Sequence, residues 1–171
     1  GVDDLELALL HPAGRAAPRG TAAWLDARRL AAHHHLRQGD AAQTAQLARR
    51  LAGRTLGVVL AGGGARGHAH VGALRAMLEA GLRPDQLGGT SMGALIAGIF
   101  ALTGDCSRFG ELGQRFGSRR AILDFTPPLV ALTASRKVTG LLQDIFGDTG
   151  IEDLWRPFFC VATDLTAARA V

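Results

Sequence analysis

The sequence contains no tyrosine, two cysteines and a single lysine, Lys137. Cys106 and Cys160 are far apart and have no metal-ligand spacing, which argues against a disulfide scaffold or a zinc site, so both are expected to be reduced packing residues. Aromatic residues make up 5% of the chain and hydrophobic residues 47%, so a core rich in alanine, leucine and valine is expected. The net charge of +4 comes from scattered arginines, so no nucleic-acid partner is predicted.

Long hydrophobic runs are also missing. The longest uncharged stretch is 86–104, and its strongly apolar part, 94–102, is much shorter than the roughly 20 residues that cross a bilayer. No transmembrane span is therefore predicted. The sequence begins with Gly1 rather than methionine and ends soon after an expected strand, so we expect it to be a piece of a longer protein.

Residues 1–53 differ from the rest of the chain. The alternation of apolar and polar residues over 5–9 predicts a short strand. Asp40 is the expected N-cap of a helix that ends before Gly53. We interpret 1–53 as a connector or the tail of an upstream domain.

Residues 54–171 alternate between strand and helix patterns. The apolar run 56–60 predicts a strand buried on both faces, and Gly81 is expected to follow a helix. Strands alternating with helices predict an α/β fold with a mostly parallel sheet and helices on both faces. The other expected elements are strands near 87–90 and 158–162, and helices over 92–102, around Phe109 to Phe116 and around Leu141 to Ile145.

A first motif, Gly62-Gly63-Gly64-Ala65-Arg66-Gly67, directly follows the strand expected at 56–60. As G-x-G-x-x-G it fits a dinucleotide-binding loop, but that fingerprint also needs an acidic residue at the end of the next strand. Asp85 has roughly the required spacing but precedes that strand. A Walker A loop is excluded because no Gly-Lys-Ser/Thr follows the glycines.

A second motif, Gly89-Thr90-Ser91-Met92-Gly93, lies between an expected strand and helix. As G-x-S-x-G in this context it predicts a nucleophile elbow, a sharp turn that exposes the serine hydroxyl. The same five residues also read as G-x-x-x-G, a helix-packing pattern.

Together the two motifs predict acyl transfer, because a nucleophile needs nearby backbone N–H groups that stabilise the oxyanion. Gly64 and Ser91 are separated by one helix and one turn, so a right-handed crossover can bring them to the same sheet edge. Arg66 could add positive charge at this edge or be an ordinary solvated arginine.

All six histidines precede Ser91, so the Ser-Asp-His order of α/β-hydrolases is not completed here. His68 and His70 follow the glycine loop, so one of them could approach the serine, but both are expected to be packing or surface residues. The run His33-His34-His35 predicts no metal site, because consecutive positions do not converge on one ion.

These motifs resemble the patatin-like phospholipases over Leu56 to Leu165, where the third matching segment is 158–165. The region with Trp24-Leu25-Asp26-Ala27-Arg28 and the histidine run is similar to the segment before the catalytic domain in bacterial proteins related to neuropathy target esterase. The resemblance implies a three-layer α/β/α fold that is C-terminally incomplete here, with 54–171 as the N-terminal part of the catalytic domain.

The resemblance further implies a serine hydrolase with a Ser–Asp dyad. Ser91 would be the nucleophile, and the oxyanion loop would be Gly62, Gly63 and Gly64, supported by Arg66, Gly67, Gly89 and Gly93. The family's aspartate lies in a downstream Asp-Gly-Gly or Asp-Gly-Ala motif; no Asp-Gly occurs in this sequence, and Asp164 lies in a stretch that precedes that motif. The chain alone is therefore expected to be inactive.

The implied substrates are lipid acyl esters, hydrolysed without metal or organic cofactor, with peripheral membrane contact and a location in the cytoplasm or at the inner face of the membrane. The residues alone leave two other functions open: a Rossmann-like dinucleotide-binding module and a non-catalytic interaction domain.

Overall fold

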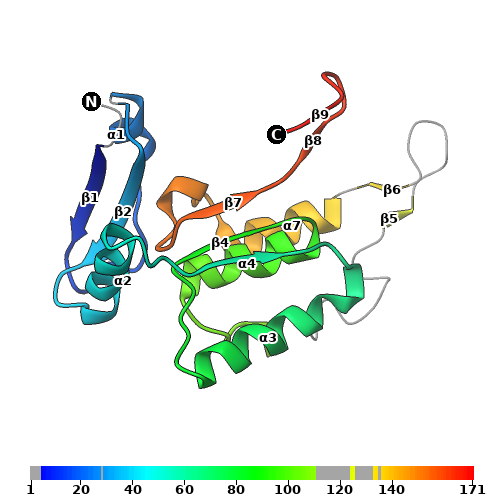
Figure 1. The fold of residues 1–171 in the computed structure, drawn as a ribbon. Coiled ribbons are helices and arrows are strands. Elements are labelled where there is room, and N and C mark those ends of the chain that lie inside the picture. Colours follow the sequence, from blue (N-terminus) through cyan, green and yellow to red (C-terminus); the bar gives the residue numbers. More distant parts are fainter. Residues whose placement is uncertain (1–4, 28, 111–123, 126–132, 135) are drawn as a thin grey trace.

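The fold is described from a computed structural model of the chain, which covers residues 5–27, 29–110, 124–125, 133–134 and 136–171 (Figure 1). The strands are β1 (Glu6–His11), β2 (Ala32–Arg37), β3 (Gly57–Leu60), β4 (Gln86–Gly89), β5 (Asp124–Phe125), β6 (Thr133–Ala134), β7 (Phe158–Cys160), β8 (Thr163–Asp164) and β9 (Arg169–Ala170). The α-helices are α1 (Ala22–Asp26), α2 (Ala41–Leu51), α3 (His68–Glu79), α4 (Met92–Thr103) and α7 (Arg136–Phe146).

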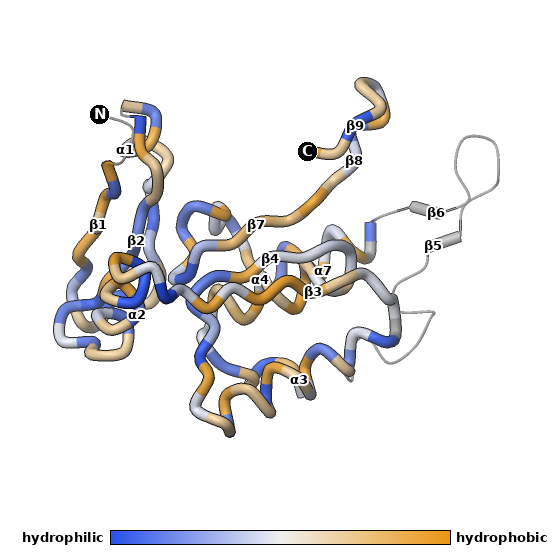
Figure 2. The backbone as a smooth tube through the Cα atoms, viewed as in Figure 1, coloured by the Kyte–Doolittle hydropathy of each residue, from blue (hydrophilic) through white to orange (hydrophobic). Residues whose placement is uncertain are grey.

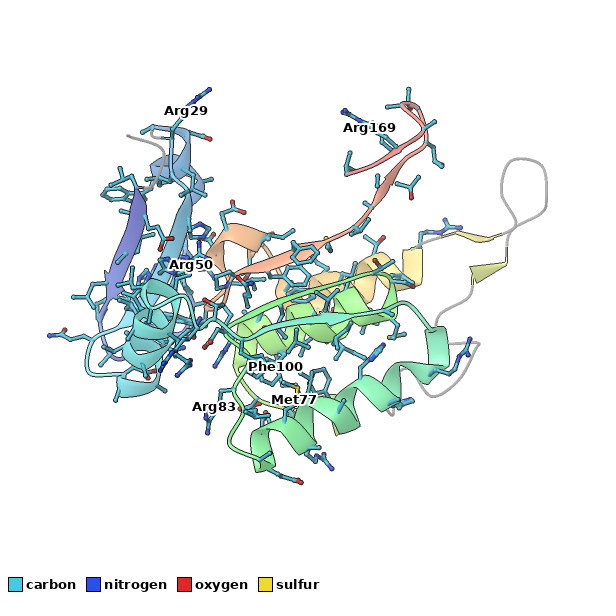
Figure 3. All side chains as sticks on the ribbon, in the orientation of Figure 1. Arg29, Arg50, Met77, Arg83, Phe100 and Arg169 are labelled. Atoms are coloured by element: carbon cyan, nitrogen blue, oxygen red, sulfur yellow. The ribbon has the colours of Figure 1, made fainter. Side chains whose placement is uncertain are left out.

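The central sheet has the strand order β3-β4-β7 in the described part of the chain, and all its pairs are parallel. Val58, Leu87 and Phe158 are register partners and contribute to one core cluster on one face of this sheet. Residues of α3, α4 and α7 complete that cluster, including the fully buried Phe100 of α4, which is labelled in Figure 3. The predicted α/β fold with a mostly parallel sheet is confirmed.

The opposite face of the sheet is open in the described residues. Val59, Gly88 and Phe159 are register partners on this face, and a side chain at Gly88 would overlap the ring of Phe159. Val59 is 69% exposed and Phe159 is 53% exposed. The expected burial of strand 56–60 on both faces is therefore wrong in this chain, because α3, α4 and α7 all contribute to the core of the other face (Figure 2).

The helix boundaries follow local sequence signals. The Asp40 side chain accepts hydrogen bonds from the amides of Ala42 and Gln43 at 3.0 Å, which caps α2 as predicted. Gly53 follows the end of α2 at φ +66°, and Gly81 follows the end of α3 at φ +77°. This left-handed conformation favours glycine, which explains why both helices end there.

The N-terminal segment contains β1, α1, β2 and α2, and β1 pairs with β2 in parallel. This unit, defined as Glu6–Leu51, is bonded to the rest of the chain by buried polar groups. The Thr21 hydroxyl donates to the Asp153 carboxylate at 2.6 Å, and the Trp155 indole donates to the Ala16 carbonyl at 3.1 Å. The boundary at 53/54 stays a prediction.

Three further expectations have different outcomes. The helix expected around Phe109 to Phe116 lies mostly outside the described residues, whereas that around Leu141 to Ile145 is α7. Cys106 is half-buried but Cys160 is exposed, so its expected packing role is wrong. No helix among the described residues has the length and apolar character needed to cross a membrane.

Candidate active site

The turn between β4 and α4 holds Ser91 in an unusual backbone conformation. Ser91 has φ 54° and ψ −126°, a combination that costs a non-glycine residue about 1–3 kcal/mol. The turn is fixed by backbone bonds from the Gly93 amide to the Thr90 carbonyl at 3.0 Å and from the Leu95 amide to the Ser91 carbonyl at 3.1 Å. A strained serine between a parallel strand and a helix is the geometry of a nucleophile elbow.

Glycines on both sides allow this turn to close. A Cβ at Gly89 would lie 2.6 Å from the Gly93 carbonyl carbon, and a Cβ at Gly93 would lie 2.5 Å from the Ala61 oxygen. Both distances are too short for real side chains, so the G-x-S-x-G spacing is required by backbone-to-backbone contact.

The Ser91 hydroxyl is available for chemistry. Ser91 occupies the N-cap position of α4, yet its side chain makes no capping hydrogen bond, although serine commonly does so at this position. The residue is exposed, and within the described ranges its hydroxyl has no hydrogen-bond partner. It also lies at the positive end of the α4 dipole, which favours developing negative charge.

The glycine loop runs beside Ser91. Strands β3 and β4 are neighbours, and the Thr90 amide donates to the Leu60 carbonyl at 3.1 Å, which continues their pairing into the two loops. A Cβ built on Gly62 would lie 3.4 Å from the Ser91 Cβ. The structure therefore brings the two predicted motifs to one edge of the sheet.

The remaining loop residues adopt a tight bend before α3. Gly64 has φ +53°, which favours glycine, and the Arg66 amide donates to the Gly63 carbonyl at 3.1 Å. A side chain at Gly67 would overlap Met92, so this glycine allows the loop to pack on the start of α4. Arg66 itself is exposed at the loop.

The family model for "Patatin-like phospholipase" matches residues 58–171, which include both motifs. The chain belongs to the patatin-like phospholipase family. It is also 34% identical to the neuropathy target esterase sws of Drosophila melanogaster over 195 residues, covering 95% of this chain and 14% of that protein. A patatin-like phospholipase domain-containing protein of Caenorhabditis elegans is 33% identical over 197 residues, covering 95% of this chain and 18% of that protein. The chain thus spans a minor part of these relatives.

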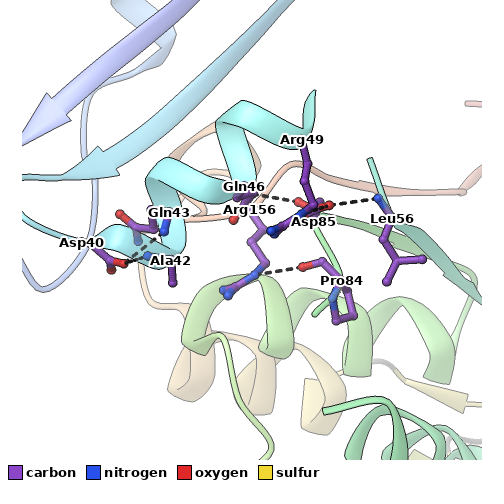
Figure 4. Close-up of polar contacts among 9 residues, drawn as sticks. All are labelled: Asp40, Ala42, Gln43, Gln46, Arg49, Leu56, Pro84, Asp85 and Arg156. Carbon is purple, nitrogen blue, oxygen red and sulfur yellow. Dashed lines mark hydrogen bonds and ion pairs between the residues drawn. The ribbon is translucent and has the colours of Figure 1, made fainter. Parts of the chain in front are cut away.

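In this patatin-like chain, Asp85 lies at the opposite end of β4 from Ser91. Its carboxylate, 3% exposed, accepts from the Arg49 Nε at 3.0 Å and from the Leu56 amide at 2.9 Å, and its backbone carbonyl accepts from Gln46 (Figure 4). An acidic residue that is buried and bonded at the amino end of the strand has no access to a ribose at the carboxyl end. The dinucleotide interpretation therefore lacks its acidic residue.

The histidine run is strand β2, which was not predicted. His33 and His35 both donate from Nε2 to the Glu152 carbonyl, at 3.0 and 2.8 Å, and His34 donates to the Glu6 carboxylate at 2.8 Å. Burial lowers the pKa of His35 to about 4, an effect that its bond to Glu152 only partly opposes. His33 and His35 thus connect the N-terminal unit to the segment before β7, whereas His34 bonds within that unit. No cluster of metal-ligating side chains occurs within the described ranges.

The other two histidines lie at the start of α3. His68 is exposed, and His70 is bonded through Nε2 to the Ala61 carbonyl at 2.8 Å. Asp164 accepts from the amides of Thr166 and Ala167 at 3.0 Å, so its carboxylate is engaged in a local turn. Sequence reasoning missed the contact of His70, because a side-chain bond to a backbone carbonyl nine residues away leaves no pattern in the sequence.

Proposed function

We propose that the protein is a serine hydrolase of lipid acyl esters, with Ser91 as the nucleophile and the amides of Gly62, Gly63 and Gly64 as the oxyanion donors. One observation carries the proposal: an exposed serine hydroxyl, without a described partner, lies on a strained turn beside the glycine loop. The names of the family and of the Drosophila relatives, a phospholipase and an esterase, support the same reaction class.

The proposed reaction has two steps. The Ser91 Oγ attacks the ester carbonyl carbon while a base takes its proton, and the carbonyl oxygen becomes an oxyanion that the loop amides stabilise. Collapse of this intermediate expels the alcohol, which receives the proton, and leaves an acyl-Ser91 ester. Water, deprotonated by the same base, then hydrolyses that ester and releases the fatty acid.

We propose that the base is the aspartate of a downstream Asp-Gly-Gly or Asp-Gly-Ala motif. The protein that carries this chain together with that motif is called the full-length protein below. Residues 1–171 alone are then expected to show no robust turnover, because no Asp-Gly occurs among them. Robust turnover by the chain alone would place the base within it.

A fluorophosphonate probe tests the nucleophile. The full-length protein should hydrolyse a lysophospholipid and become labelled at Ser91, and Ser91→Ala should abolish both. Ser107→Ala is the matched control, because Ser107 is also exposed but lies outside the strained turn, where its hydroxyl donates to Asp105 at 2.6 Å. Full labelling of Ser91→Ala, or its loss in Ser107→Ala, would overturn the assignment.

Probe labelling together with calorimetry separates the two other functions. A dinucleotide-binding module would bind NAD or FAD tightly in calorimetry and leave the probe unreacted. A non-catalytic interaction domain would bind no dinucleotide and would also leave the probe unreacted.

We also propose that the protein makes peripheral contact with membranes, since the substrates lie there. Sedimentation with phospholipid vesicles measures this contact.

A further inference from the structure

The side chain of His70 contacts the backbone at the start of the glycine loop. Its Nε2 lies 2.8 Å from the carbonyl oxygen of Ala61, the residue between the end of β3 and Gly62. A carbonyl oxygen only accepts, so the Nε2 of His70 must carry the hydrogen. The neutral ring with hydrogen on Nε2 and the imidazolium both provide this donor, so the bond does not depend on the charge of the ring.

This bond determines how the first peptide of the loop is turned. The chain has no cis peptide among the described residues, and in a trans peptide the carbonyl oxygen and the following N–H point in opposite directions. The Ala61 oxygen lies close to Gly93 of α4 as well as to His70 of α3. The Gly62 amide hydrogen is therefore directed away from His70 and Gly93.

The glycine loop needs such an anchor. Glycine has little conformational preference of its own, so three consecutive glycines do not hold a peptide orientation by sterics alone. Gly62 is also the loop residue that lies against Ser91, with its built Cβ 3.4 Å from the serine Cβ. A rotated Ala61–Gly62 peptide would turn a carbonyl oxygen, which repels an oxyanion, to the side on which the amide hydrogen now lies.

We propose that His70 is a positioning residue for the oxyanion loop: it holds the Ala61 carbonyl toward α3 and so keeps the Gly62 amide available to an oxyanion that forms beside Ser91. This inference rests on the proposed function. His70 acts through the backbone, without touching the substrate and without transferring a proton.

Three variants of the full-length protein test the proposal. His70→Leu removes the donor, His70→Gln places an amide N–H at a similar distance from the backbone, and His70→Asn has the same amide on a shorter side chain. Loss of one oxyanion donor lowers kcat about 10²–10³-fold, so a misdirected donor should lower it about 10–100-fold in His70→Leu and His70→Asn. KM should change less than about 3-fold in both, because ground-state binding is not affected.

His70→Gln should restore kcat to within about 5-fold of the wild type and leave the pH profile unchanged, since no titrating group is involved. His68→Leu, a change at an exposed histidine of the same helix turn, is the control and should have wild-type kinetics. If His70→Leu fails to fold, the Gln and Asn variants give the comparison.

Two results would overturn the inference. Wild-type kcat in a folded His70→Leu or His70→Asn protein would mean that the loop needs no anchor. Equal loss in the Gln and Asn variants would indicate that the ring itself is required, as for a proton-transferring group. A wild-type protein without turnover or probe labelling would instead overturn the proposed function, and this inference with it.

Discussion

The two ends of strand β4 are held in place by different means. At the amino end, buried Asp85 bonds Arg49 of the N-terminal unit and the Leu56 amide. At the carboxyl end, Gly89 to Gly93 take part in no side-chain hydrogen bond among the described residues, and the chain is held by backbone bonds and glycine contacts. Side-chain hydrogen bonds fix the amino end, whereas backbone bonds and close glycine contacts fix the carboxyl end beside the exposed Ser91.

The largest expected effect of a single substitution is at the carboxyl end. Gly93→Ala would place a methyl group 2.5 Å from the Ala61 oxygen, between backbone segments that are hydrogen-bonded on both sides. We expect it to lower the free energy of unfolding by about 3 kcal/mol or more, the upper range for overpacking. Urea unfolding of the full-length protein measures this change.

Gly72→Ala is the matched control, because a Cβ at Gly72 in α3 meets nothing within 4 Å. It should raise the free energy of unfolding by about 0.5–1 kcal/mol, since alanine loses less conformational entropy in a helix. If Gly93→Ala were as stable as the wild type, the close approach of the two loops would be wrong.

The next effect is a pH dependence of stability at His35 of β2, which bonds the segment before β7. The neutral ring of His35 donates to the Glu152 carbonyl and accepts from His11, and burial holds its pKa at about 4, below the ordinary 6.5. Between about pH 4 and 6.5, His35 is therefore protonated in the unfolded chain and neutral in the folded chain. Stability should therefore fall as the pH falls from about 6.5 to 4, by about 3 kcal/mol in total, with no contribution above pH 6.5.

His35→Gln keeps a donor for the Glu152 carbonyl but does not titrate, so its stability should change less over this pH range. His68→Gln, at an exposed histidine, should leave the wild-type slope unchanged. Equal slopes in His35→Gln and the wild type would contradict a buried neutral His35.

A smaller effect is expected from Asp85→Asn. The amide keeps an acceptor for the Leu56 N–H but loses the charge that pairs with Arg49, whose side chain is 39% exposed and therefore partly solvated. We expect a loss of about 2 kcal/mol, less than for a fully buried ion pair. The exposed Asp26, changed to Asn, should stay within about 0.5 kcal/mol of the wild type. If Asp85→Asn were as stable as Asp26→Asn, the claim that side-chain bonds of Asp85 stabilise the amino end of β4 would be wrong.

The smallest effect has the opposite sign. Ser91→Gly relieves a backbone conformation at φ 54° that is unfavourable for serine, so the variant should be more stable by about 1 kcal/mol while losing activity. Ser107→Gly has no strain to relieve and should not gain stability. Thermal unfolding compares the two, and a destabilised Ser91→Gly protein would mean that the turn stores no strain.

The sequence predicted the features that depend on neighbouring residues. The Asp40 cap, the glycines after α2 and α3, and the serine turn each need only a few consecutive positions, so their signals are local. The proximity of Gly62 and Ser91 followed from the handedness of a single crossover.

The features that the sequence did not predict depend on distant residues. The bonds of His33 and His35 to Glu152 join segments more than 100 residues apart, and three consecutive histidines show no alternation that would indicate strand β2. The exposure of Val59 was also not predicted. An apolar run indicates a buried strand, but it does not show whether helices of the same chain cover both faces of the sheet.

The most direct test of the account is a crystal structure of the full-length protein after reaction with a fluorophosphonate. The account predicts phosphorus bonded to the Ser91 Oγ and the phosphoryl oxygen about 2.7–3.1 Å from amide nitrogens of Gly62–Gly64. A probe bonded to another residue, or a phosphoryl oxygen directed away from the glycine loop, would contradict it.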